Sequence, residues 1–304
     1  MKLTNHLPLL LECLRRWESR PSLPVFRDEY WAVISPQVGV VFDEIPTGLW
    51  QVLLGLDWER YRAETLTLDP AAEEARLRRS RDKVEQLFGL TLAGEAILFG
   101  AFTCMDGYAR FDGGEHRVFL GVDESHGRGA YLDVLMTHEL THVVRETRPA
   151  VWEGWGLSPR MTHDEFVENL PVVEHLANEG LACVVSELLN PGEDPWHYAY
   201  QEEDGLAEVL LHAAALDQGV HEELRAGPDG DYGRLYGRRR YGRPLPSFAH
   251  YVWAWQWMKH VLHDLCGGDV RALVERCSKD WVQDALTWRL EGQRIQPAPH
   301  GRSA

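Results

Sequence analysis

The sequence feature that most constrains this chain is the pentapeptide His-Glu-Leu-Thr-His at positions 138–142. It lies in a stretch without Gly or Pro, residues 131–146, in which apolar residues recur at helical spacing. On a helix, residues four apart lie on one face, so His138 and His142 would present two imidazoles to one ion, with Glu139 beside them. This is the H-E-x-x-H pattern, in which two His bind Zn²⁺ and the Glu is a general base.

A third ligand must come from outside the pentapeptide, because a catalytic zinc site has three protein ligands and one open position. We expect Glu179, which lies in an apolar segment of helical character. The three residues that follow it, Gly-Leu-Ala at 180–182, are small or apolar and permit close helix packing. Three other side chains remain alternatives for this role: His175, Asp164 and Glu165.

Most of the remaining chain has the pattern of helices, with a few short strands before the motif. We expect helices at residues 3–17, 70–88, 162–189 with a break at Pro171, 198–224, 247–265 and 269–288; residues 49–61 also fit a helix. Short strands are expected at residues 33–34, 38–42, 96–103, 108–111 and 117–122. The turn sequence Asp112-Gly113-Gly114 predicts a hairpin between the last two strands, and residues 151–160 and 226–246 are expected to be irregular.

These patterns predict an α+β protein that is mainly helical. We expect an N-terminal helical or mixed region at residues 1–90, a metal-binding domain at residues 91–290 and a disordered tail at residues 291–304, although one domain could include everything before the tail. The aromatic residues Trp255 and Trp257 lie on an expected helix, and we expect them to be part of its buried core.

Composition excludes several classes of partner. With 31 basic and 47 acidic residues the net charge is −16, which disfavours binding to nucleic acid and to anionic membranes. No stretch approaches the ~18 apolar residues of a membrane span. The five Cys are scattered and form no C-x-x-C pair, which favours reduced thiols and a cytoplasmic location.

Two segments together resemble the gluzincin metallopeptidases: residues 138–142, His-Glu-Leu-Thr-His, and residues 178–182, Asn-Glu-Gly-Leu-Ala. Aminopeptidases of that group carry a similar Asn-Glu-Gly segment with the third ligand. The separation of His142 and Glu179, 37 residues, is longer than in thermolysin and the aminopeptidases. It is more similar to a bacterial family described only as predicted zinc-dependent proteases. The resemblance covers about residues 95–190.

The resemblance implies a zincin-like core, in which a small mixed sheet precedes the motif helix and a helical C-terminal lobe carries the glutamate ligand. It implies one Zn²⁺ per chain, a peptide or protein substrate, and Glu139 as the base that takes a proton from water at the metal. A further hydrogen-bond donor should stabilise the oxyanion of the substrate. The candidates for that donor are Tyr241, His250 and Tyr251.

Other functions are compatible with the same residues. A metal-dependent amidase or another hydrolase would use the same chemistry on a different bond. A metal-binding regulatory protein would keep the ligands without turnover, although a structural site has no need of Glu139. Coincidence in a helical protein that binds no metal is the remaining alternative.

Overall fold

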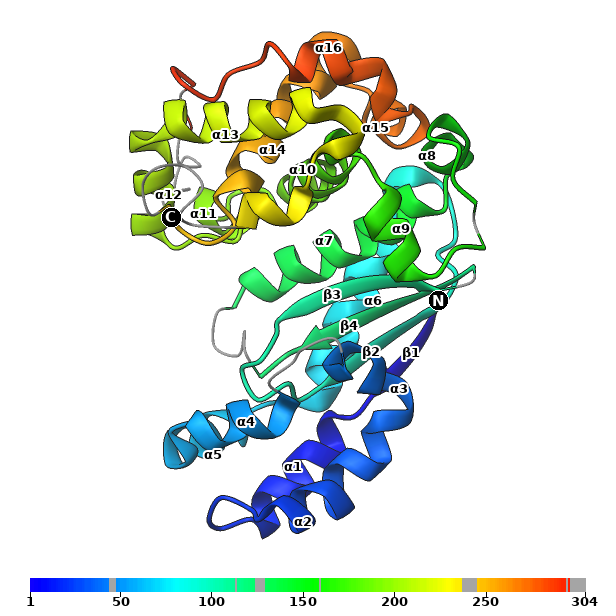
Figure 1. The fold of residues 1–304 in the computed structure, drawn as a ribbon. Coiled ribbons are helices and arrows are strands. Elements are labelled where there is room, and N and C mark those ends of the chain that lie inside the picture. Colours follow the sequence, from blue (N-terminus) through cyan, green and yellow to red (C-terminus); the bar gives the residue numbers. More distant parts are fainter. Residues whose placement is uncertain are drawn as a thin grey trace, which may run out of the picture. The chain divides into compact units, whose positions relative to one another are not determined.

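The fold is mainly helical, with one small mixed β-sheet, as the sequence predicts (Figure 1). It was obtained as a computed structural model, which describes residues 1–43, 48–112, 114–123, 129–158, 160–236, 245–293 and 295. The chain divides into two compact units. Unit 1 contains residues 1–110 and 115–136, and unit 2 contains residues 111–114 and 137–304.

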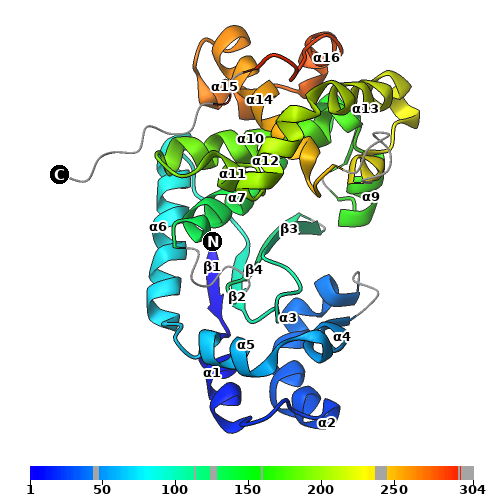
Figure 2. The same ribbon diagram turned by 90° about the vertical axis from the view of Figure 1, so that its left-hand side faces the viewer.

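The sheet has four strands in the order β1-β2-β4-β3: β1 (Lys2–Asn5), β2 (Glu95–Phe99), β4 (Glu115–Gly121) and β3 (Gly107–Asp112) (Figure 2). β1 pairs with β2 and β2 pairs with β4, both in parallel. Only two residues separate the neighbouring strands β3 and β4, which is too short a connection for a parallel pair. The three strands predicted before the motif are therefore confirmed, while β1 falls in a segment predicted as helix.

The pairing of β1 with β2 explains why unit 1 does not end near residue 90, where the sequence suggested a boundary. Lys2 lies opposite Glu95 and Asn5 lies opposite Leu98, so residues on both sides of that boundary belong to one sheet. A division at residue 90 would separate two hydrogen-bonded strands.

Unit 1 also contains seven helical segments among its described residues, and one of them corrects a prediction. They are α1 (Leu7–Arg16), α2 (Leu23–Phe26), η1 (Arg27–Trp31), α3 (Ala32–Asp43), α4 (Gly48–Gly55), α5 (Trp58–Thr65) and α6 (Pro70–Phe88). The strands predicted at residues 33–34 and 38–42 are wrong, because α3 covers both. Its residues Ile34, Val38, Val41 and Phe42 are buried at helical spacing.

Helix α6 has the predicted bounds, and its ends show why. The Asp69 carboxylate accepts hydrogen bonds from the backbone N–H groups of Ala71 and Ala72, and Pro70 occupies the first turn. Gly89 then adopts a left-handed conformation with φ of 65° and ends the helix.

A buried carboxylate organises the core of unit 1. Asp123 accepts hydrogen bonds from the hydroxyl of Tyr61, at 2.7 Å, and from the backbone N–H groups of Ala101 and Phe102. Phe102 has a φ of 52°, which is uncommon for a residue with a side chain. The carboxylate therefore stabilises a turn that the backbone alone disfavours.

The motif helix is α7 (Tyr131–Glu146), with the predicted bounds; its residues from Thr137 onward belong to unit 2. The other helices described in unit 2 are α8 (Pro149–Gly154), α9 (His163–Asn169), α10 (Val172–Leu189), α11 (Pro195–Tyr198), α12 (Glu203–Leu211), α13 (Ala213–Ala226), α14 (Ala249–His260), α15 (Val270–Glu275) and α16 (Val282–Ala285). Short 3₁₀ and π turns join several of them: η2 (Gly227–Asp229), η3 (Tyr232–Tyr236), η4 (Val261–Leu265) and η5 (Ser278–Trp281).

Two predictions for unit 2 need correction. Residues 149–154 form α8 where an irregular segment was expected from position 151, since Pro149 starts a helical turn. The single helix expected at residues 198–224 is three helices, interrupted at Tyr200, whose φ is 53°, and at His212. The break at Pro171 between α9 and α10 is confirmed. Most of the expected tail lies outside the described residues.

The core of unit 2 is built on the close packing of α10 against α14. A Cβ atom at Gly180 would lie 2.2 Å from the carbonyl oxygen of Ala254, so only glycine allows this approach. Trp253, Trp255 and Trp257 of α14 are buried, as expected for the last two. Each indole N–H donates a hydrogen bond to a carboxylate, on Asp217, Glu187 and Asp284 respectively.

In the part of the chain that the structure describes, we find no helix that combines the length and the apolar character needed to cross a bilayer.

Candidate metal centre

The two helices that carry the candidate ligands, α7 and α10, are joined at two levels. At one level, Thr137 donates a hydrogen bond to the hydroxyl of Ser186 at 3.2 Å and accepts one from the amide of Asn190 at 2.9 Å. At the other level, the guanidinium of Arg145 donates two hydrogen bonds to the carboxylate of Glu174, at 2.7 and 2.9 Å. Early residues of α7 therefore meet late residues of α10, so the two helices are antiparallel.

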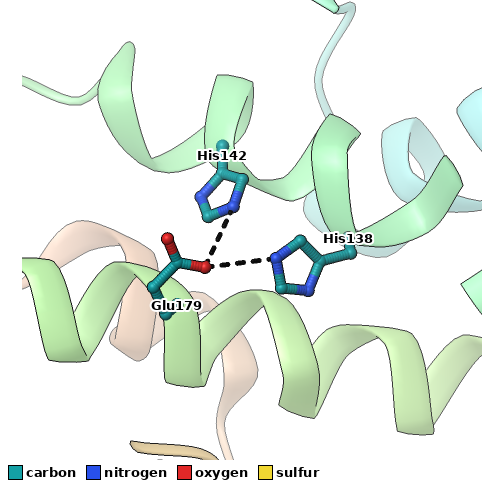
Figure 3. A group of neighbouring side chains, drawn as sticks. All are labelled: His138, His142 and Glu179. Atoms are coloured by element: carbon teal, nitrogen blue, oxygen red, sulfur yellow. Dashed lines mark hydrogen bonds and ion pairs between the residues drawn. The ribbon is translucent and has the colours of Figure 1, made fainter. Parts of the chain in front are cut away.

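The three residues expected to bind metal lie together between these two levels (Figure 3). Oε2 of Glu179 lies 3.2 Å from Nε2 of His138 and 3.4 Å from Nε2 of His142. All the ligand atoms of these three side chains lie within 4.8 Å of one another, so the group is compact enough to hold an ion. Within the described ranges, no other group of three or more His, Cys, Asp or Glu side chains is as compact. The structure therefore places Glu179 where the sequence analysis expected it.

Two of the three separations within this group are those of neighbouring ligands in a tetrahedral zinc site. Bonds of about 2.0–2.1 Å at tetrahedral angles place neighbouring ligand atoms about 3.3 Å apart. The two distances from the Glu179 carboxylate to the imidazole nitrogens are 3.2 and 3.4 Å. Two neutral imidazole nitrogens and one carboxylate oxygen are also ligands that zinc prefers. The residues present therefore fit the chemistry of such a site, and all three ligand atoms lie within 4.8 Å of one another.

The electrostatics of this group favour a cation. Burial alone would raise the pKa of the Glu179 carboxyl, but His142 and His138 hold that pKa well below its usual range. Burial alone would lower the pKa of His142, but the Glu179 carboxylate raises it to about 10. Without metal, a proton on an imidazole balances the negative charge of the Glu179 carboxylate. A divalent cation would displace that proton when it binds.

The outward-facing ring nitrogens of the two His residues differ. Nδ1 of His138 lies 3.9 Å from Sγ of Cys183, a buried thiol on α10. Nδ1 of His142 is buried and has no hydrogen-bond partner among the described residues. Metal-bound His residues commonly donate this second N–H to an acceptor, which fixes the orientation of the ring. The Cys183 thiol is close enough to serve in this way for His138.

Two further carboxylates of α7 belong to the site. Glu139 follows His138 directly and is 6% exposed. Glu146 lies one turn beyond His142 and is also buried, and it accepts a hydrogen bond from the amide of Asn178 at 3.1 Å. Its spacing of four residues from His142 places Glu146 on the ligand face of the helix, so helical periodicity is the signal in the sequence that indicates it.

The other candidates for the third ligand lie elsewhere. His175 donates a hydrogen bond from Nε2 to the carbonyl of Val167 at 3.1 Å, so this nitrogen is not a free ligand. Glu165 and Thr162 form a capping box at the start of α9, as the sequence predicts. The neighbouring Asp164 lies on the exposed surface of the same helix. None of these side chains belongs to the compact group.

Of the three residues expected to donate a hydrogen bond to the oxyanion, two are described by the structure, and only one of them contacts a candidate ligand. Tyr251 is stacked on the ring of His138, with the ring centroids 6.2 Å apart and the planes at 14°. His250 is fully buried, with Nε2 3.1 Å from the hydroxyl of Tyr232, and burial lowers its pKa to about 3. This imidazole is therefore neutral at physiological pH. Tyr241 lies outside the described residues.

Two tyrosines that the sequence analysis missed are close to the site. The ring of Tyr200 lies 4.7 Å from the ring of His138. The hydroxyl of Tyr236 lies 3.4 Å from that of Tyr251. Burial, and next the charge of Glu179, raise the pKa of Tyr251 above the usual value. Tyr236 is 41% exposed as a residue, but its hydroxyl lies against that of buried Tyr251, and desolvation there, followed by the charge of Glu179, also raises its pKa. These two phenols therefore keep their protons and can donate hydrogen bonds.

A centre with two His and one Glu occurs on more than one fold, so neither the fold nor the ligands alone identify the protein. The candidate ligands come from two antiparallel helices, the buried Glu139 is next to His138 in sequence, and the ring of Tyr251 is stacked on His138. No protein-family model, curated protein or solved structure that was compared with this chain matches it.

Proposed function

We propose that this protein is a zinc-dependent peptidase. The observation that carries the proposal is the position of one Glu179 oxygen between the Nε2 atoms of His138 and His142, at separations typical of neighbouring ligands in a tetrahedral zinc site. Glu139, the residue expected to act as general base, adjoins the first of these ligands in sequence and is buried.

The number and type of ligands favour catalysis over a structural role. Structural zinc sites have four protein ligands, commonly Cys and His, whereas catalytic sites have three and keep one position open. The compact group has three members among the described residues. The strands β2 to β4 directly before the motif helix and the third ligand on a later helix also follow the order of elements expected of a zincin-like core.

In the proposed mechanism, Zn²⁺ held by His138, His142 and Glu179 would act as a Lewis acid and would lower the pKa of a water molecule in the open position towards about 7. Glu139 accepts the proton of the attacking water and later gives it to the leaving amine. The protonated hydroxyls of Tyr251 and Tyr236 are the candidate phenol donors for the developing oxyanion. His250 donates less readily, because its Nε2 already interacts with a tyrosine hydroxyl.

Metal analysis tests the first part of this proposal. We expect about one zinc ion per purified chain, and its loss in both His138→Ala and His142→Ala. His263→Ala, which changes an exposed His of η4, is the matched control and should retain zinc. Zinc content that is the same in His138→Ala and in the control would contradict the assignment of the site.

Peptide cleavage tests the second part. The zinc-loaded protein is incubated with a mixture of peptides from digested cell lysate, and new peptide ends are identified by mass spectrometry. Glu139→Gln should keep its zinc and lose cleavage by a factor of about 10² or more, while Glu168→Gln, on the exposed surface of α9, should keep both. Cleavage at the wild-type rate by the Glu139→Gln protein would reject the base assignment.

A further inference from the structure

Two aromatic residues of unit 2 have an unfavourable backbone conformation. Tyr200 has a φ of 53° and Phe248 a φ of 61°, in the left-handed region where residues with side chains are uncommon. Such a conformation lasts only where the surrounding structure enforces it, and it is concentrated at functional sites. Neither position has the glycine or asparagine that would relieve the strain.

Both strained residues contact the same ring beside the metal centre. The ring of Tyr251 lies 5.8 Å from that of Tyr200 and 5.4 Å from that of Phe248. Tyr251 is in turn stacked on His138, and Tyr200 contacts His138 directly at 4.7 Å. The two strained segments therefore place aromatic rings next to a candidate zinc ligand.

One buried side chain joins the two strained segments. The amide of Gln201 donates a hydrogen bond to the carbonyl oxygen of Ser247, at 2.8 Å. Gln201 directly follows Tyr200, and Ser247 directly precedes Phe248. Gln201 is 8% exposed, so this hydrogen bond is protected from water. It fixes the separation of the two backbone segments that present the rings.

Part of this aromatic group faces solvent. Phe248 is 40% exposed and Tyr236 is 41% exposed, and their rings meet edge to face at 5.7 Å. Apolar area left in water beside a reaction centre can be covered by a substrate. The carboxylates of Glu139, Glu146 and Glu179 are close to the same centre, so an acidic side chain would be repelled there.

We propose that Phe248 and Tyr236 form a recognition surface for an aromatic side chain of the substrate, and that Gln201 positions this surface beside the metal centre. The inference rests on the proposed function and adds a substrate class to it: peptides with an aromatic residue next to the cleaved bond. Aromatic rings contribute both buried area and edge-to-face contacts with the protein rings. Gln201 is a positioning residue, because it acts through the backbone of its neighbours.

Binding of two matched hydroxamates tests this inference without requiring turnover. Propanohydroxamic acid and 3-phenylpropanohydroxamic acid carry the same metal-binding group, and only the second carries a phenyl ring. Their dissociation constants for the zinc-loaded protein are measured by calorimetry. We expect the phenyl compound to bind at least about tenfold more tightly, because its ring covers exposed aromatic area.

Variants identify the residues responsible for that preference. Phe248→Gly removes the ring and relieves the strained φ, and should reduce the ratio of the two dissociation constants to about one. Phe248→Tyr keeps the ring and should keep the ratio. Leu211→Ala, which removes an apolar side chain that is 78% exposed on α12, is the control and should also keep it. Gln201→Leu should reduce the ratio, although it removes no aromatic ring.

The outcomes separate this inference from the proposed function. Equal binding of both compounds to the wild-type protein overturns the aromatic surface and leaves the metal centre intact. A ratio that survives Phe248→Gly overturns the assignment to Phe248. Failure of both compounds to bind, in protein that does not take up zinc, overturns the proposed function itself.

Discussion

Replacing Glu174 by Gln should strongly destabilise unit 2. The guanidinium of Arg145 is fully buried, and the carboxylate of Glu174 is 1% exposed. The substitution keeps the size of the side chain but removes its charge, and it turns one hydrogen-bond acceptor towards Arg145 into a donor. A buried cation would remain without a counter-charge.

The structure gives the magnitude. Removing one partner of a buried ion pair costs about 3–5 kcal/mol, and no discount for solvent screening applies because both side chains are shielded from water. For units of about 150–250 residues, this corresponds to a fall in Tm of about 6–20 °C. Replacing both residues, as in Arg145→Met with Glu174→Leu, should restore only part of the stability. Arg145 also donates hydrogen bonds to the carbonyl oxygens of Leu273 and Arg276, which would lose their donor.

Urea unfolding followed by circular dichroism measures this difference, with Glu168→Gln as the exposed control that should change stability by less than about 0.5 kcal/mol. The pair also joins α7 to α10, which carry the candidate ligands, so Glu174→Gln should weaken zinc binding as well. A loss of less than about 1 kcal/mol for Glu174→Gln would refute the reasoning. It would mean that water reaches the guanidinium in the folded protein.

Three further predictions concern other parts of the chain. Gly180→Ala should lower stability by about 1–3 kcal/mol in thermal unfolding, because the new Cβ would lie 2.2 Å from a carbonyl oxygen of α14; an unchanged Tm would show that α10 can shift freely. In metal-free protein, the pair formed by His142 and Glu179 should contribute most stability between pH 4.5 and 6.5, and Tm should fall as pH rises above 6.5. The raised pKa of His142 contributes stability that is lost as pH rises towards about 10, and the lowered pKa of Glu179 contributes stability that is lost as pH falls below 4.5. A Tm that rises steadily from pH 6.5 to 10 would contradict this. Tyr61→Phe should cost about 1–3 kcal/mol, because it removes a hydrogen bond to buried Asp123; urea unfolding that matches the wild type would argue against that hydrogen bond.

Much of the grouping of His138, His142 and Glu179 could be predicted from the sequence because it depends on local spacing. His138 and His142 are brought together by a single helical turn, and the bounds of that helix follow from the absence of Gly and Pro. The prediction of Glu179 required information beyond helical spacing, since this residue lies on another helix. Its apolar surroundings and the small residue after it indicated a tightly packed helix, and Gly180 indeed lies against the backbone of α14.

Helix α3 shows why local propensity was misleading. Its Val and Ile residues favour strands when short runs are considered alone. The burial of Ile34, Val38, Val41 and Phe42 instead follows the spacing of one helix face, a signal that was already present in the sequence. Packing of that face against the core outweighed the preference of the individual residues.

The aromatic residues around the centre could not be predicted in this way. Tyr200 lies just after α11 and Phe248 just before α14, both with a strained backbone, and no periodic pattern brings them to His138. They meet through tertiary contacts between segments about fifty residues apart, which depend on how α11, α12 and α14 pack. Glu146 is different, because its spacing of four residues from His142 predicts that it lies on the same helix face as the two His residues.

The order of strands in unit 1 has a consequence for its synthesis. Among the described strands, β1 lies at the edge of the sheet and pairs with β2, whose residues follow it by more than ninety positions. At about 5–20 residues per second, a ribosome would take about 5–20 s to make that partner. During this interval Lys2–Asn5 would have an unpaired edge, and the first helices would lack the sheet beneath them. The full pairing of β1 with β2 can therefore form only after Leu98 has left the ribosomal tunnel.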